Sequence, residues 1–338
     1  MADYEKKLET INSFYMDYMQ QLSRQILGHT KLLDRLFIAF LCKGNILLEG
    51  APGLGKTSLA KAWAGYFGLD FRRIQFTPDL MPLDIIGSNI LEDAKDGRHF
   101  RFYKGPLFTN VLLGDEINRA TPKTQSAFME AMEEKRVSFL GEVHELPDPF
   151  YVIATQNPIE LEGTYPLPEA QVDRFFMKLN FRMPDFSSLL GIMELSGQSK
   201  EGLPVEGEHF LARQQKAKEL LKSWKELAEH IIVPERAKSY IARLVLETHP
   251  EHSSMTEMKR FLSYGASPRA AIALYSAIKA KAVMDGRVNA SMDDVDELAP
   301  DICAHRIIAS FEAEAEGLDG RELLKRAMAA ARREYDIS

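Results

Sequence analysis

The chain has 338 residues, of which 45% are hydrophobic and 27% charged, enough for two soluble domains or one large one. Its net charge of -7 argues against general nucleic-acid binding, which favours a basic face. The two cysteines, Cys42 and Cys303, form neither a disulfide framework nor a metal cluster, so we expect buried free thiols in a reducing cytoplasm. No signal-peptide pattern opens the chain, and no uncharged stretch reaches the roughly 20 residues of a membrane helix.

Two helical segments precede the first strand. Apolar residues at helical spacing predict helices over 5–27 and 31–42, and Gly44 ends the second. The apolar run that follows, 45–48, has the length of a strand. After a glycine-rich loop, Leu59, Trp63 and Phe67 recur every four residues and predict a helix with one apolar face.

The loop between this strand and this helix has the pattern G-x-x-x-x-G-K-T of a phosphate-binding P-loop. Such a match is expected about 0.01 times by chance in a chain of this length. Between a strand and a helix, the backbone N–H groups of the loop face one point and bind phosphate, whereas the alternative is a plain glycine turn. The predicted nucleotide-binding residues are Gly50, Ala51, Pro52, Gly53, Leu54, Gly55, Lys56, Thr57 and Ser58.

Strands and helices alternate as far as residue 181. We expect further strands at 71–76, 110–116, 150–154 and 175–181, and helices that begin at Pro122 and span 168–174. Two hairpins are also predicted, one pairing 88–91 with 99–103 around a turn at 93–97, and one pairing 136–140 with 142–146. This alternation predicts an α/β fold with a parallel sheet covered on both faces.

The composition changes near residues 182–185, and the second half is helical. Residues 186–208 read as a polar linker with one helix, and no later segment has a convincing strand pattern. Helices are expected at 209–230, 234–248, 267–285, 292–304 and 319–334. The predicted domains are therefore an α/β domain at 1–183, a linker at 184–208 and a smaller all-helical domain at 209–338.

Two acidic residues, Asp115 and Glu116, end the apolar strand 110–114. Ligands bind beyond the carboxyl ends of parallel strands, so we expect both acids at the same sheet edge as the P-loop. In an ATP site, Lys56 would reach the β- and γ-phosphates, Thr57 and Asp115 would bind Mg²⁺, and Glu116 would polarise the attacking water. The alternative is a strand that ends in solvated acids.

Over nearly its whole length, the chain resembles the MoxR family of AAA+ ATPases. The resemblance is densest from Gly44 to Phe181 and is carried by segments 50–57 (Walker A), 73–80, 112–120 (Walker B), 154–158 and 168–175. It implies a P-loop AAA+ core followed by a smaller helical lid, with ATP and Mg²⁺ bound to the core. Gly114 departs from the family pattern, in which Ala is more usual.

The resemblance also implies roles for residues outside the two Walker motifs. Asn157 matches sensor 1, and Arg174 matches the arginine finger that reaches the γ-phosphate of a neighbouring subunit. Arg269 matches sensor 2, which would complete the ATP site of its own subunit from the lid. Gly28 and His29 match the segment near the adenine. The alternatives are a turn residue at Asn157 and surface ion pairs at the two arginines.

A finger that acts on a neighbour implies a ring, and the resemblance implies a hexamer. The family is associated with chaperone-like assembly of partner complexes or insertion of metal cofactors into them, often with proteins that carry a von Willebrand A domain. Two other functions stay open at this point: a DNA-associated motor or loader, and a nucleotide-gated switch with slow turnover.

Overall fold

The centre of the protein is a five-stranded parallel sheet. The computed structural model describes residues 2–94, 97–158, 163–196 and 208–336. The strand order is β2-β5-β8-β1-β9, and each neighbouring pair is parallel. The strands are β1 (Ile46–Glu49), β2 (Phe71–Gln75), β5 (Val111–Asp115), β8 (Tyr151–Gln156) and β9 (Met177–Asn180). The predicted parallel α/β sheet is confirmed.

The central strands are apolar on both faces because helices cover both sides of the sheet. Leu47, Leu112 and Val152 face the side covered by the short helix α4 (Pro82–Ile86) and by α5 (Pro122–Glu134). Alternate positions such as Ile46 and Val111 face α2 (Thr30–Leu41) and α3 (Lys56–Tyr66). A strand buried on both sides reads as a continuous apolar run, which is the pattern seen in the sequence.

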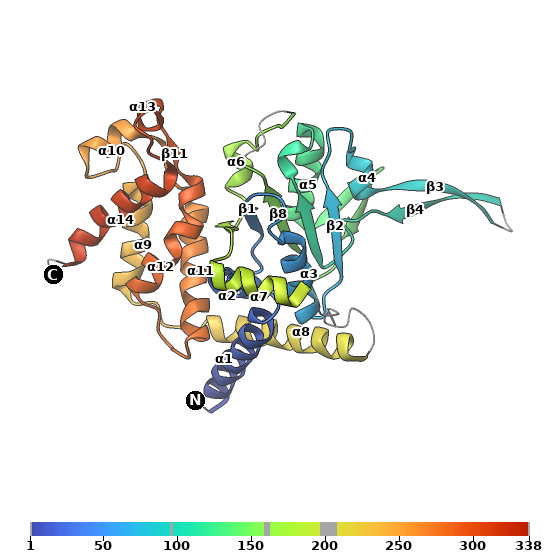
Figure 1. The fold of residues 1–338 in the computed structure, drawn as a ribbon, viewed down its shortest axis with the longest axis horizontal. Coiled ribbons are helices and arrows are strands. Elements are labelled where there is room, and N and C mark those ends of the chain that lie inside the picture. Colours follow the sequence, from blue (N-terminus) through green and yellow to red (C-terminus); the bar gives the residue numbers. More distant parts are fainter. Residues whose placement is uncertain (1, 95–96, 159–162, 197–207, 337–338) are drawn as a thin grey trace.

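Two antiparallel hairpins extend from the sheet domain. One pairs β3 (Gly87–Ala94) with β4 (Gly97–Lys104) and projects far from the body of the protein (Figure 1). It is longer than predicted, and part of its predicted turn, at 95–96, lies outside the described residues. The other pairs β6 (Arg136–Phe139) with β7 (Glu142–Glu145), as expected. Their bases meet where Phe102 stacks on His144 at a centroid distance of 4.2 Å.

The C-terminal part is mainly helical. The linker contains the expected helix, α7 (Phe186–Ser196), although residues 197–207 lie outside the described part. The five predicted helices are present as α8 (Glu208–Ala228), α9 (Glu235–Glu247), α11 (Pro268–Met284), α12 (Met292–Ile302) and α14 (Gly320–Asp336).

Several short elements were missed from the sequence. These are the helices α4, α10 (Thr256–Phe261) and α13 (Phe311–Ala315); α6 (Glu169–Val172), by contrast, was expected at 168–174 and is slightly shorter. There are also two 3-10 turns, η1 (Ile117–Arg119) and η2 (Ala304–Arg306). The prediction of no strand after residue 209 was wrong, because β10 (Leu262–Tyr264) pairs antiparallel with β11 (Ile308–Ala309). Runs of two or three residues are too short to show a strand period.

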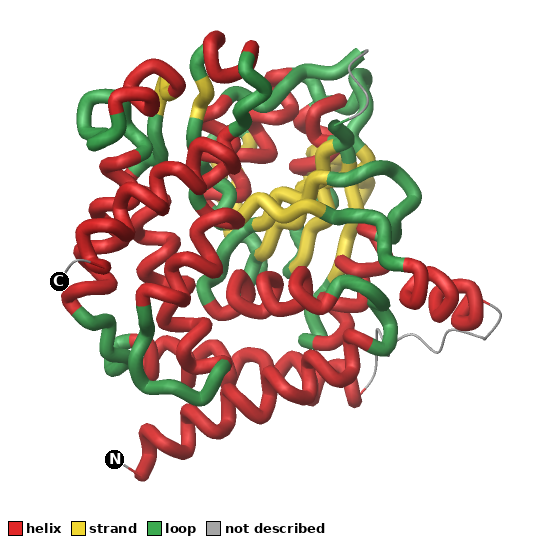
Figure 2. Tube along the Cα trace, turned by 60° about the vertical axis from the view of Figure 1, so that its left-hand side comes forward, coloured by secondary structure: helices red, strands yellow, loops and turns green. Residues whose placement is uncertain are grey.

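The N-terminal helix α1 (Ala2–Ser23) joins the sheet domain to the C-terminal helices (Figures 1 and 2). It packs against α8 and α11, and Asn12 donates a hydrogen bond to the carbonyl of Met284 at 2.6 Å. Arg35 of α2 is almost fully buried and donates to Asp301 of α12 at 3.0 Å. One apolar cluster therefore continues from the sheet into the C-terminal helices, and the domain boundaries at 183 and 208 stay a prediction.

Both cysteines are free, as expected from their spacing; Cys303 is buried as expected, whereas Cys42 is only partly buried. Burial raises the pKa of the Cys42 and Cys303 thiols to about 12, so both are protonated near neutral pH. Within the described ranges, every helix is too short or too polar to cross a bilayer.

Candidate functional site

The loop Gly50–Thr57 connects β1 to α3 and has the shape that a phosphate needs. Gly53 and Gly55 have φ angles of +80° and +102°, a region in which a side chain is strained. Gly50 packs so closely on the carbonyl of Phe181 that an added Cβ would lie 2.4 Å from it. Gly55 is the N-cap of α3 and no side chain caps this helix, so its first N–H groups point out from the loop.

Lys56 lies in the first turn of α3 and is 7% exposed. Its Nζ donates to the carbonyl oxygen of Gly50 at 2.6 Å, so the side chain folds back over its own loop. Burial lowers the pKa of Lys56, while the carboxylates of Asp115 and Glu116 act in the opposite direction. The two acids are therefore close enough to the lysine to influence it, although they follow a different strand.

Asp115 ends β5 and is held by two partners. Its Oδ1 accepts a hydrogen bond from the Thr155 hydroxyl at 2.6 Å. Its Oδ2 accepts from Arg73 of β2, with the Nη2 at 2.7 Å and the Nε at 3.2 Å. Thr155 belongs to β8, so neighbouring strands on both sides fix the carboxylate of Asp115.

Glu116 follows Asp115 in a backbone conformation that is uncommon outside glycine, with φ 58° and ψ 50°. Its backbone N–H donates to the Thr155 hydroxyl at 2.9 Å, and its Oε2 accepts from the Gln75 amide at 2.9 Å. Arg119 lies 3.4 Å from the same oxygen. Because of this left-handed backbone conformation, the side chains of Glu116 and Asp115 point in different directions, and the two carboxylates bind different partners.

The glycine at position 114 has a packing reason. A Cβ at Gly114 would lie 2.8 Å from the ring of Phe128 and 3.1 Å from the ring of Phe76. These two rings pack edge to face at 5.2 Å beneath the end of β5. The methyl group of an alanine at position 114 would therefore push Phe128, and with it α5, away from the strand that carries Asp115.

Asn157 comes directly after β8 and is buried, at the same sheet edge as the P-loop and the two acids. The structure therefore brings together the segments 50–57, 115–116 and 155–157, as the sequence predicted.

Gly28 and His29 lie beside this edge, in the loop before α2. The His29 ring stacks on Phe181 at a centroid distance of 4.2 Å, and Phe181 contacts Gly50 at the start of the P-loop. Burial lowers the pKa of His29, which keeps its ring neutral near pH 7.

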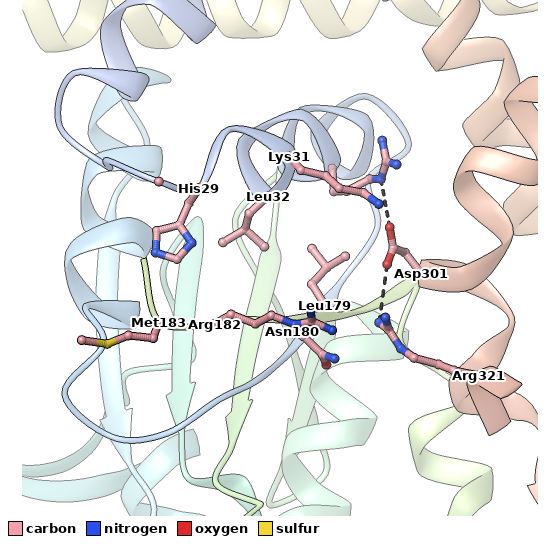
Figure 3. Close-up of a pocket in the computed structure, with 11 residues that line it drawn as sticks. His29, Lys31, Leu32, Leu179, Asn180, Arg182, Met183, Asp301 and Arg321 are labelled. Carbon is pink, nitrogen blue, oxygen red and sulfur yellow. Dashed lines mark hydrogen bonds and ion pairs between the residues drawn. The ribbon is translucent and has the colours of Figure 1, made fainter. Parts of the chain in front are cut away.

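A recess of about 280 Å³ opens next to His29. Figure 3 shows His29 and Leu32 on one wall and Asp301 and Arg321 of the C-terminal helices on the other. Asn180 of β9 lies between the walls. The recess combines a flat ring, apolar contacts and polar groups, which are the features of a base-binding pocket.

Arg174 and Arg269 lie at the opposite end of the sheet. The residues that flank β9 show which end of the sheet is which. Before the strand, Phe176 N–H donates to the Asn45 carbonyl; after it, Phe181 N–H donates to the carbonyl of Glu49, next to the P-loop. Arg174 precedes this strand, whose four residues span about 13 Å. Its Nη1 lies 3.0 Å from Glu133 Oε2, near the end of α5 that is remote from Asp115.

Arg269, at the start of α11, binds the same carboxylate. Its Nη2 lies 2.6 Å from Glu133 Oε1, and its Nη1 lies 3.5 Å from Asp173. The sequence-based expectation that Arg269 completes the ATP site of its own subunit therefore does not fit this geometry, because C-terminal helices anchored at Asp173 place Arg269 beside Arg174. Arg73, Gln75, Thr155 and Glu133 had been given no role, although the first three fall in or next to the family-like segments.

Known protein families match both the sheet domain and the C-terminal helices. Residues 45–177 match the family model "ATPase family associated with various cellular activities (AAA)", and residues 255–327 match the AAA lid domain. The chain is 38% identical to Chaperone MoxR1 of Mycobacterium tuberculosis over 91% of this chain and 79% of the relative. It is 39% identical to the uncharacterized protein YeaC of Bacillus subtilis over 93% of both chains. A solved structure of a candidate ATPase from Cytophaga hutchinsonii is 37% identical, has a TM-score of 0.85 and covers 97% of each chain.

Proposed function

Because the chain belongs to the MoxR family of AAA+ ATPases, we propose that it hydrolyses ATP to drive chaperone-like remodelling of partner protein complexes. The observation that supports this most strongly is the meeting of three strand ends at one edge of the sheet. Through its hydroxyl, Thr155 connects Asp115 with the backbone of Glu116, beside the loop that carries Lys56. A phosphate cradle, a metal-binding acid and a base are the parts of a phosphoryl-transfer site.

In the proposed reaction, the backbone N–H groups of the P-loop bind the phosphates and Lys56 moves from the Gly50 carbonyl to the phosphate oxygens. The base would sit in the recess beside His29. Glu116 accepts a proton from the attacking water, and Gln75 orients the Glu116 carboxylate through its hydrogen bond at 2.9 Å. Asn157 would help to position the water.

The residues present fit a nucleotide-bound Mg²⁺. Thr57 and Asp115 would hold it through a hydroxyl and a carboxylate, the oxygen donors that Mg²⁺ prefers, and the phosphates and water would supply the other ligands. Among the described residues there is no cluster of three or more acids, histidines or cysteines that could hold a metal. When bound, Mg²⁺ would neutralise developing charge on the phosphates.

A ring would complete the site. Arg174 and Arg269 lie at least the length of β9 from their own P-loop, so we infer that both act on ATP bound to a neighbouring subunit. Such fingers contribute roughly 10³–10⁵ to the rate of related reactions. A hexamer is the proposed ring size. Assembly or metal-cofactor insertion, with a von Willebrand A domain partner, is the proposed client function.

The test of the reaction is Glu116→Gln in the full chain. Turnover should fall by about 10²-fold or more while ATP still binds, because the amide cannot accept the proton from water. Glu130→Gln, which changes an exposed acid on α5, is the matched control and should keep full turnover. Unchanged hydrolysis by Glu116→Gln would rule out its role as the base. Stimulation of turnover by DNA in a salt-dependent way would favour a DNA-associated motor instead.

A further inference from the structure

Glu133, near the end of α5, binds two arginines that come from different parts of the chain. Its Oε2 lies 3.0 Å from Arg174 Nη1, and its Oε1 lies 2.6 Å from Arg269 Nη2. Arg174 precedes β9 of the sheet domain, whereas Arg269 begins α11 of the C-terminal helices and lies 136 positions away from Glu133 in sequence. One carboxylate therefore links two guanidinium groups across the sheet domain and the helices that follow it.

This arrangement depends on the negative charge. Two guanidinium groups that share one carboxylate lie only a few Å apart, where like charges repel each other. Glu133 offsets one of the two positive charges and fixes the distance between the two groups, since each oxygen binds one arginine. Without the charge, Arg174 would lose this partner and Arg269 would keep only its longer contact with Asp173 at 3.5 Å, so the two partly exposed side chains would no longer be held together.

The shared carboxylate leaves both arginines able to bind a further anion. A guanidinium has five N–H donors, and Glu133 lies against one nitrogen of each. The remaining donors lie on a partly exposed surface, although Arg269 Nη1 also lies 3.5 Å from Asp173.

We propose that Glu133 is a positioning residue for the shared ATP site, holding Arg174 and Arg269 side by side so that one subunit presents both guanidiniums together to the γ-phosphate of its neighbour. The proposal rests on the proposed function, in which these arginines act on the ATP of another subunit. The contact with Glu133 also makes the position of the two arginines depend on the C-terminal helices, because a shift of α11 away from the sheet would withdraw Arg269 from Glu133.

Glu133→Gln in the full chain tests the proposal. The amide offers an N–H to one of the two arginines, where it meets another donor, and it carries no charge. Turnover at saturating ATP should fall by about tenfold or more, while the KM for ATP and the affinity for a fluorescent ATP analogue should stay within about twofold. A general loss of structure would change all three quantities.

Two further variants sharpen the measurement. Glu134→Gln is the control, since Glu134 is the next residue, pairs with Arg136 at 3.2 Å and is also exposed, at 52% against 36% for Glu133; it should keep wild-type turnover. Glu133→Asp keeps the charge and should lose no more than about threefold. Equal losses for Glu133→Asp and Glu133→Gln would contradict a role that depends on charge.

The location of the defect can be tested by mixing subunits. Glu133→Gln subunits mixed with Glu116→Gln subunits should be more active than the sum of the two separate preparations, because the Glu116→Gln subunits supply intact arginines to intact sites. If Arg174→Ala and Arg269→Ala both keep full turnover, the shared site itself is wrong. If they are inactive while Glu133→Gln turns over within twofold of wild type, only the role of Glu133 is wrong.

Discussion

Thr155→Val should lower the rate of ATP hydrolysis strongly while it changes the affinity for ATP little. Thr155 is fully buried, and its hydroxyl both donates to Asp115 at 2.6 Å and accepts from the backbone of Glu116 at 2.9 Å. Valine has nearly the same shape, so packing is preserved and only these two hydrogen bonds are lost. Losing the bond to a charged carboxylate costs about 1.5–3 kcal/mol, and an unpaired buried N–H costs about 1–3 kcal/mol. Because these costs overlap, we expect about 3 kcal/mol of lost stability.

The same change should lower turnover by about 10²-fold, since small displacements of catalytic groups have effects of this size. Nucleotide affinity should stay within a few-fold, because β8 contacts the P-loop through the backbone, with Gly50 N–H donating to the Gln156 carbonyl, and this bond is unchanged. The measurements are phosphate release at saturating ATP and Mg²⁺, binding of a fluorescent ATP analogue, and chemical denaturation.

Thr109→Val provides the matched control. Thr109 is 1% exposed and donates its hydroxyl to the Asp70 carbonyl at 2.8 Å, next to the opposite end of β5. This variant should lose about 1 kcal/mol of stability and no turnover. Thr155→Ser should restore most of the activity. Turnover by Thr155→Val within twofold of wild type, or an equal loss in Thr109→Val, would refute the reasoning.

Three further predictions concern the loop, the C-terminal contacts and the response to acid. Gly55→Ala should weaken ATP binding because of its φ of +102°, whereas Gly141→Ala at a hairpin tip, with a φ of +86°, should not; titration with a fluorescent ATP analogue decides. Asp173→Asn removes the carboxylate that binds Arg306 at 2.9 Å, so amide hydrogen exchange in η2 and in the first turn of α11 should rise, and unchanged protection would contradict this. Burial, with help from Arg306, holds the pKa of His305 well below 6.5, so the unfolded chain binds more protons below that pH. Stability should therefore be complete above about pH 6.5 and fall by about 1.4 kcal/mol per pH unit just below it, and His305→Gln should reduce this slope in denaturation experiments at several pH values.

The sheet and the centre of the site could be predicted because their signals are local. A buried parallel strand is a continuous apolar run, and the P-loop pattern occupies eight consecutive residues, Gly50–Thr57. Asp115 and Glu116 follow from the same logic, since the carboxyl ends of parallel strands share one edge. The long hairpin β3–β4 was underestimated because its described apolar residues Ile90, Leu91 and Phe100 are exposed and do not form one buried face.

The contacts that connect distant segments could not be predicted. Thr155 has no distinctive sequence pattern, and its role appears only when β8 lies beside β5. The position of Arg269 depends on how the C-terminal helices sit against the sheet, which Asp173 and Glu133 fix from far away in sequence. A motif match gave Arg269 a role, and only the fold showed that it lies beside Arg174.

The most direct test of a shared ATP site is a mixture of two inactive variants, Arg174→Ala and Glu116→Gln. Each alone should show almost no hydrolysis. In rings mixed in equal amounts, an intact Arg174 faces an intact Glu116 at about a quarter of the interfaces, so about a quarter of wild-type turnover should return. Full turnover by Arg174→Ala alone, or no recovery in mixtures that gel filtration shows to form common rings, would contradict the account.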